Sequence, residues 1–402
     1  MKKHWLSAAP LVFVLSLALV FGFIEAKNRS EFFTARSLEN LRALNEKHEM
    51  VVEDLFAIEE TESPLIAELL QADVLIPIPV ADRDNRGLVV TLNPGLSGEA
   101  MLLLQPVNSL SDVELATAAV EYQEAIPEFA SVEVDQDVEL QSPFYDWFFE
   151  ARAEPVELSS EPEDEDRIQV AVVDSGIDGD HEIFDKNSVL TGWNTISDDT
   201  TMYDDVGHGT HVAGIISKGI SGIEIIPYKI VDSKGGKLSN VIEAVSKAIA
   251  DEVDVINMSF GVPSASYALE TLVEKAYKKD IIMVAAAGNN NKDRGFYPAQ
   301  YEHTIAVAGV DSAGNKMPNS NYGDWVDVAA YGYHVRSSLP DNEYGYKSGT
   351  SQATAKISAA VAELLMDASS DEDLSLEQVL SGLESAGKAI TEGKLAGVTR
   401  IQ

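Results

Sequence analysis

The chain of 402 residues carries 66 acidic side chains against 29 Lys and Arg, which gives a formal net charge of -37 at pH 7. Such a charge repels phosphate backbones and anionic lipid surfaces, which argues against nucleic acid as a partner. The sequence contains no cysteine, so disulfides, thiolate nucleophiles and cysteine-based zinc sites are excluded. Any catalytic nucleophile must therefore be an oxygen or a nitrogen.

Residues 1–26 have the pattern of an export signal. Lys2 and Lys3 precede an uncharged apolar run from Trp5 to Ile24, which is long enough to span a bilayer. The cleavage pattern after this run is poor, so a cleaved signal peptide and a retained membrane anchor both stay open. We expect the rest of the chain to be secreted or extracytoplasmic, in contact with a membrane only if this segment is retained.

Two smaller parts are expected before the main domain. Residues 27–86 have a helical pattern, with Leu38, Leu41 and Leu44 at three-residue spacing, and are expected to form a helical accessory segment. Residues 87–140 are expected to form a compact α+β unit. Its expected elements are strands at 88–92 and 129–134 and a helix from 111 to about 124. An acidic stretch near residues 157–166 has the composition of a solvated connector.

From residue 141 to 402, apolar β-rich runs alternate with helical stretches. Strands are expected at 168–173, 225–231, 253–257, 281–286 and 305–310, and helices at 211–217, 238–251 and 267–279. Alternation of this kind predicts an α/β fold in which a mainly parallel sheet is covered by helices on both faces.

Three motifs lie where an open α/β sheet collects reactive groups, at the carboxyl ends of strands and the starts of helices. Asp174 ends a strand, His208 precedes a helix within Gly-His-Gly-Thr-His, and Ser351 opens an Ala-rich helix. Alone, each has a simpler interpretation: a turn aspartate, half of a histidine pair that also suits a metal, and a helix N-cap. The order Asp, His, Ser is more specific, because it is the chain order of the subtilisin triad.

The sequence resembles the subtilase family, peptidase family S8, over roughly residues 141–402. The resemblance extends through the blocks Val255–Gly261, Ala285–Asn289 and Tyr297–Ala299. It implies a subtilisin-like three-layer fold with a mainly parallel central sheet, preceded by a small α+β propeptide domain. It also implies a serine endopeptidase that acts on protein or peptide substrates and requires no cofactor.

The chemistry explains why these residue types are needed. A serine hydroxyl is a poor nucleophile at neutral pH, so His208 must accept the proton of Ser351 during attack and return it to the leaving amine. Asp174 would orient the imidazole and stabilise its charged form. By resemblance, the side-chain amide of Asn289 and the backbone N–H of Ser351 would bind the oxyanion, although Asn289 could also be a turn residue.

Substrate binding follows from the same resemblance. An extended peptide would pair with two exposed backbone edges, residues 235–238 and 259–261. The residues expected to bind substrate are Gly235, Gly236, Leu238, Ser259, Phe260, Gly261, Ala287 and Gly288. Segments 259–261 and 285–288 would form the walls of the primary side-chain pocket. These walls are small and uncharged, which favours a bulky apolar residue before the cleaved bond.

Residues 87–140 resemble, more weakly, the subtilase propeptide, which caps the catalytic domain and leaves its tail in the cleft. The chain would then be a zymogen with its own propeptide as an intramolecular partner, cut by itself near Leu140. The alternative is a permanent domain.

Some positions depart from the family pattern. Gln352 follows the nucleophile where methionine is usual, and the segment between Gly214 and Tyr228 is shorter than in calcium-binding relatives. A requirement for calcium is therefore doubtful, while structural calcium stays open. Two rival functions remain: a catalytically inactive scaffold of subtilase shape, and a hydrolase of esters. The absence of a Gly-x-Ser-x-Gly elbow at Ser351 weighs against the second.

Overall fold

The structure is a computed structural model that describes residues 35–48, 50–57, 87–92, 100–106, 110–127, 129–141, 144–146, 167–184, 188–368 and 374–401. The chain divides into two compact units, Met1–Asp135 and Gln136–Gln402. The predicted export signal and the acidic connector lie outside the described residues. Within the described part, no helix combines the length and apolarity needed to cross a bilayer.

The first unit is a four-stranded antiparallel sheet packed with helices. Its strands lie in the order β1 (Met50–Ala57), β3 (Ala100–Pro106), β2 (Leu88–Leu92) and β4 (Phe129–Val134). Helix α2 (Ala35–His48) packs on helix α4 (Asp112–Ala125), which also packs on β4. The helices and the sheet share a core that contains Leu41, Leu88, Leu104 and Tyr122, all with no exposed surface. The Ser111 side chain caps α4 in a capping box with Glu114, as a serine three residues before a glutamate predicts.

The expectation of a helical segment over residues 27–86 is wrong at residues 50–57, which form strand β1. Helix α2 was expected, but β1 is an edge strand that pairs with β3, from Met50 opposite Pro106 to Ala57 opposite Ala100. This pairing places the described part of residues 27–86 in the same unit as the strands that follow it. The structure of an edge strand depends on the strand with which it pairs. Because β3 was not predicted, its partner β1 could not be predicted either.

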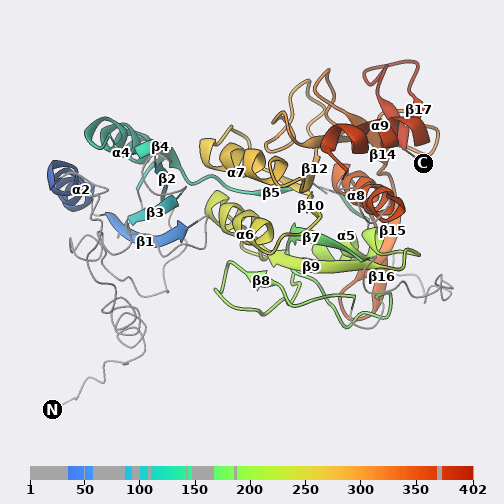
Figure 1. Cartoon of the computed structure of the whole chain (residues 1–402), viewed down its shortest axis with the longest axis horizontal. Helices are drawn as coiled ribbons and strands as arrows, with labels where there is room; N and C mark the ends of the chain where they lie inside the picture. The colour runs from blue at the N-terminus through green and yellow to red at the C-terminus, as the bar shows by residue number, and fades with distance from the viewer. Residues whose placement is uncertain are drawn as a thin grey trace, which may run out of the picture. The chain divides into compact units, whose positions relative to one another are not determined.

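The second unit contains a nine-stranded sheet (Figure 1). Its order is β17 (Lys388–Ala389), β18 (Thr399–Ile401), β14 (Val328–Tyr331), β13 (Ile305–Val310), β12 (Ile282–Ala286), β10 (Val255–Met258), β7 (Ile168–Asp174), β9 (Ile223–Lys229) and β8 (Trp193–Asn194). All neighbouring strands are parallel except β17 and β18. The prediction of a mainly parallel sheet is confirmed.

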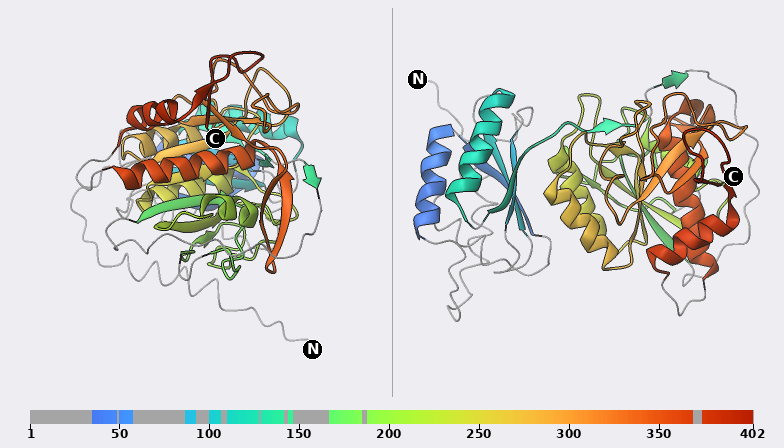
Figure 2. Two further views of the ribbon diagram at one scale, coloured as in Figure 1. Left: turned by 90° about the vertical axis from the view of Figure 1, so that its right-hand side faces the viewer. Right: turned by 90° about the horizontal axis from the view of Figure 1, so that it is seen from above.

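Helices cover both faces of this sheet, as the α/β prediction requires. Figure 2 shows α6 (Leu238–Ala250) and α7 (Tyr267–Tyr277) on one face and α8 (Thr350–Asp367) on the other. Helix α5 (Gly209–Ile216) packs against α8, and α9 (Leu376–Ala386) packs on α8 further along the chain. A separate antiparallel sheet consists of β15 (Val335–Leu339), β16 (Glu343–Ser348) and β6 (Phe144–Asp146).

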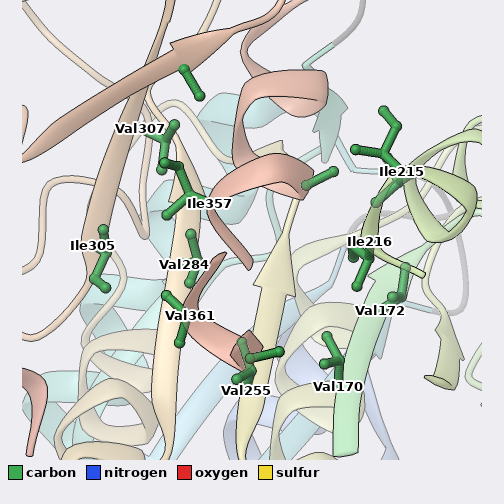
Figure 3. Packing of buried hydrophobic residues seen from close by; sticks show 14 of the residues in the cluster. Val170, Val172, Ile215, Ile216, Val255, Val284, Ile305, Val307, Ile357 and Val361 are labelled. Carbon is green, nitrogen blue, oxygen red and sulfur yellow. The ribbon is translucent and has the colours of Figure 1, made fainter. Parts of the chain in front are cut away.

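The main hydrophobic core lies between the sheet and the helix pair α5 and α8. Figure 3 shows alternate side chains of the strands, such as Val170 and Val172 of β7, facing Ile216 of α5 and Ile357 and Val361 of α8. All five residues are at most 1% exposed. Because successive strand residues point to opposite faces, this packing fixes the register of each strand.

Candidate active site

Three chain segments meet where β7 ends and where α5 and α8 begin. Asp174 is the last residue of β7, His208 is the N-cap of α5, and Ser351 lies in the first turn of α8. All three have no exposed surface. Helix α5 starts very close to the turn after β7, since a Cβ at Gly209 would lie 2.1 Å from the carbonyl oxygen of Gly176. Glycine at this position therefore permits the approach of His208 to Asp174.

The first link of the predicted triad is present. The Nδ1 atom of His208 lies 2.7 Å from Oδ1 of Asp174, and the N–H of Ser175 donates to the same oxygen at 2.8 Å. Because a carboxylate only accepts, we assign the imidazole proton to Nδ1. The Nε2 atom then has a free lone pair, and it has no hydrogen-bond partner among the described groups. A buried imidazole in this state is suited to accept a proton as a general base.

The second link of the triad is not a hydrogen bond in this structure. The Ser351 hydroxyl donates to the carbonyl of Ser259 at 2.9 Å, and the N–H of Gln141 donates to that same carbonyl at 3.0 Å. Transfer of the hydroxyl proton to His208 therefore requires rotation of the serine side chain. Catalytic hydrogen bonds are commonly loose before the reactive complex forms, so this orientation is compatible with the predicted roles.

Two donors converge on one carbonyl oxygen beside Ser351. The Nδ2 atom of Asn289 donates to the carbonyl of Gln141 at 2.6 Å, and the N–H of Ser351 donates to the same oxygen at 3.2 Å. The amide of Asn289 is held in this orientation because its Oδ1 accepts from the N–H of Thr350 at 3.1 Å. An oxyanion hole has this arrangement of a side-chain donor and a backbone donor at the start of a helix.

The chain segment that ends at Gln141 lies extended between the two predicted backbone edges. On one side, the N–H of Leu238 donates to the carbonyl of Gln136 at 2.8 Å, and the N–H of Val138 donates to the carbonyl of Gly236 at 3.0 Å. On the other side, β5 (Glu139–Leu140) pairs antiparallel with β11 (Phe260–Gly261). A peptide that is paired on both sides in this way is held as an added strand.

The comparison with protein families decides the classification of this fold and site. The model of the subtilase family matches residues 165–389, which is more than half of the chain. The chain belongs to the subtilase family. Subtilases are serine-type endopeptidases, so the resemblance seen in the motifs is confirmed at the level of the family.

Individual relatives agree with this classification. Over 213 residues, 49% of this chain, the subtilase is 41% identical to a subtilisin of Bacillus pumilus, and the match covers 76% of that protein. It is also 41% identical to subtilisin J of Geobacillus stearothermophilus, of which the match covers 55%. The chain thus spans only about half the length of several curated relatives. A crystal structure of a lanthipeptide protease is similar with a TM-score of 0.53 and 25% identity, over 58% of this chain and 85% of that one.

A buried carboxylate that the sequence reasoning missed connects the segments of the subtilase site. Asp204 accepts from the Ser175 hydroxyl at 2.8 Å and from the Thr210 hydroxyl at 2.7 Å, and Ser175 in turn accepts from the N–H of Gly209 at 2.9 Å. Burial raises the pKa of Asp204, and the hydrogen bonds from Thr210 and Ser175 oppose this rise. In the sequence, only the position of Asp204, four residues before His208, could have indicated this role.

A buried lysine supports the same turn from the other side. The Nζ atom of Lys229 donates to the carbonyls of Ser175 and Tyr203 at 2.7 and 2.8 Å and to Oδ1 of Asp205 at 2.7 Å. Burial raises the pKa of Asp205, but the hydrogen bonds from Lys229 and from the N–H of Ser233 outweigh it and lower the pKa to about 2. The pair therefore fixes the backbone that follows Asp174.

We expect Asp205→Asn to lower the free energy of unfolding at pH 7 by about 2 kcal/mol, because Lys229 would stay buried without a counter-charge. The folded pKa of Asp205 lies below its ordinary value of 3.8, so this stabilisation is present above pH 3.8 and is lost as the pH falls towards 2. Urea unfolding of the wild type and the variant at pH 7 and at pH 2.5 measures the difference in the free energy of unfolding. Asp180→Asn, at an exposed position, is the control. A deficit that is equal at pH 7 and pH 2.5 would contradict the assignment.

Within the described ranges, no group of three or more His, Asp or Glu side chains has the arrangement of a metal site. This observation does not test whether the protein binds structural calcium.

Proposed function

We propose that this subtilase is made as a precursor and hydrolyses its own chain between Gln141 and Ser142. The observation that carries the proposal is the carbonyl of Gln141, which accepts hydrogen bonds from both Asn289 and the N–H of Ser351. In a serine protease, the carbonyl held by such donors belongs to the bond that is cleaved. The sequence alone suggested a cut near Leu140, and the proposed cut lies one residue further along the chain.

The steps follow from the positions of the side chains. The Ser351 hydroxyl leaves Ser259, passes its proton to Nε2 of His208 and attacks the carbonyl carbon of Gln141. The oxygen of that carbonyl becomes negative and is stabilised by the two donors already directed at it. His208 then gives the proton to the nitrogen of Ser142 as the C–N bond breaks. Asp174 stabilises the imidazolium throughout, and water releases Gln141 from the acyl-enzyme with His208 as the base.

Protein substrates would use the same cleft once residues 136–141 have left it. Most of the hydrogen bonds that hold this segment are made by its backbone, so an unrelated extended peptide can form the same ladder. We propose that the unit before residue 136 acts as the propeptide and that the enzyme works outside the cytoplasm. The apolar run at residues 5–24 supports export, as does the 36% identity over 208 residues to a minor extracellular protease of Bacillus subtilis.

Amino-terminal sequencing and active-site labelling test this proposal together. We expect purified mature protein to begin at Ser142 and to carry one fluorophosphonate on Ser351, because only an activated serine reacts with this reagent. The precursor should label more slowly, since Gln141 occupies the oxyanion hole. A folded, processed protein that does not react would instead be the inactive scaffold. A mature terminus far from Ser142 would contradict self-cleavage at this bond.

A further inference from the structure

The two walls of the predicted primary pocket both touch one aromatic ring. A Cβ built on Gly261 would lie 2.4 Å from Cβ of Phe296, and a Cβ built on Gly288 would lie 2.6 Å from Cδ2 of its ring. Neither glycine has room for a methyl group on that side. Gly261 comes from the 259–261 wall and Gly288 from the 285–288 wall, so the phenylalanine side chain lies between the two walls that should enclose a substrate side chain.

The backbone that carries this ring is held on both sides. The next residue, Tyr297, exchanges two hydrogen bonds with Val262, at 2.9 and 3.0 Å, which ties the phenylalanine to the strand that forms the first wall. On its other side, Gly295 packs directly on the ring system of Trp325. Phe296 is 7% exposed. These contacts fix the backbone on both sides of Phe296 and therefore the direction in which its side chain leaves the chain.

The side chain at the proposed cut does not bond to the pocket walls. The Nε2 atom of Gln141 donates to the carbonyl of Glu139 in its own strand at 2.9 Å, and its Oε1 lies 3.4 Å from Nδ2 of Asn289. Although Gln141 is only 2% exposed, its amide folds back along the peptide. This is the conformation expected if the space beyond the two walls is already filled.

We propose that Phe296 closes the primary pocket, so that this subtilase cleaves after a residue that is short or that folds back as Gln141 does, and discriminates against Phe, Tyr and Leu at that position. The inference rests on the proposed function, because it concerns the specificity of the same site. It replaces the expectation of a bulky apolar residue, which was drawn from the small wall residues alone. The walls are small because they accommodate an aromatic ring of the protein itself.

A substrate series tests this specificity in the mature wild-type enzyme. Internally quenched peptides carry the sequence of residues 136–140, then a variable residue X, then Ser. We expect kcat/KM for X = Gln or Ala to exceed that for X = Phe by about 30-fold, since a large side chain has to displace packed atoms. Equal rates for Gln and Phe, or a preference for Phe, would overturn the proposal without any variant.

Phe296→Gly should strongly weaken the preference for X = Gln over X = Phe. With the ring removed, kcat/KM for X = Phe should rise by at least about tenfold relative to X = Gln. The ratio of two substrates on one enzyme sample does not depend on how much of the variant is folded, so partial loss of stability cannot mimic this result. Phe184→Gly, which removes another buried phenylalanine of the same unit, is the matched control and should leave the ratio unchanged. An unchanged ratio in Phe296→Gly would overturn the inference.

The precursor offers a second readout. Gln141→Phe should slow self-cleavage, Gln141→Ala should not, and the double variant Gln141→Phe with Phe296→Gly should recover the wild-type rate. If Ser351 reacts with fluorophosphonate and peptides are cut with Phe preferred, only the specificity inference is wrong. If no peptide is cut and Ser351 does not react, the proposed function is wrong and the inference falls with it.

Discussion

Ser351→Ala should leave the full-length chain uncut between Gln141 and Ser142. It should also reduce kcat on peptides by about 10⁶-fold, because subtilisin, which is similar to this chain, loses about that factor when its serine is removed. The physical reason is local. The serine oxygen is needed to form the acyl bond, whereas the backbone N–H of residue 351, which donates to the Gln141 carbonyl, is unchanged in the variant. The variant should therefore keep its bound tail and accumulate as precursor.

The measurement is an electrophoretic time course of the purified precursor, followed by sequencing of any new amino terminus. Ser358→Ala is the matched control, because Ser358 is equally buried in the same helix but donates to Asn257 and not to the substrate carbonyl. It should be processed. If the Ser351→Ala precursor were cut at the same bond when no other protease is present, the cut would not depend on this serine.

The buried parallel strands could be predicted from the sequence because they are continuous apolar runs. The expected strand at 305–310 coincides with β13, and that at 168–173 differs from β7 by one residue. In such strands both faces are covered, so composition alone reveals them. Strands β1, β3, β15 and β16 were not predicted. They pair antiparallel with partners that composition does not specify, and their pairing decides their structure.

The site shows the same division between local and non-local information. The positions of Asp174, His208, Asn289 and Ser351 at element ends follow from local motifs, and the structure brings Asp174 to His208 and Asn289 to the backbone of Ser351 through the shared carbonyl of Gln141. The hydroxyl orientation of Ser351 depends on Ser259, which is distant in the sequence. Local patterns give the type of residue at a site, and tertiary contacts decide where its atoms point.

Asp174→Asn should reduce kcat/KM by about 10⁴-fold while the fold is retained, because the substitution preserves the shape of the side chain and removes its charge. In this structure, Oδ1 of Asp174 accepts from both His208 and the N–H of Ser175, whereas Oδ2 has no partner among the described groups. Asparagine can adopt two orientations here. If its nitrogen faces His208, Nδ1 must accept and the imidazole has the wrong tautomer for Nε2 to act as a base.

In the other orientation, the asparagine oxygen keeps both hydrogen bonds, but the new NH₂ group replaces Oδ2 in a buried site without an acceptor. The imidazolium that forms during attack then has no negative charge beside it. Both orientations therefore slow the reaction, and kcat/KM on the peptide with X = Gln measures the loss. Asp178→Asn, the same chemical change four residues away, should retain activity within about threefold, because the carboxylate of Asp178 accepts from the N–H of Asp341 at 2.8 Å and not from the imidazole, and asparagine can accept the same bond through its oxygen. A similar loss in both variants would mean that this loop tolerates no amide, and a loss confined to Asp174→Asn would identify the carboxylate as the partner of the imidazole.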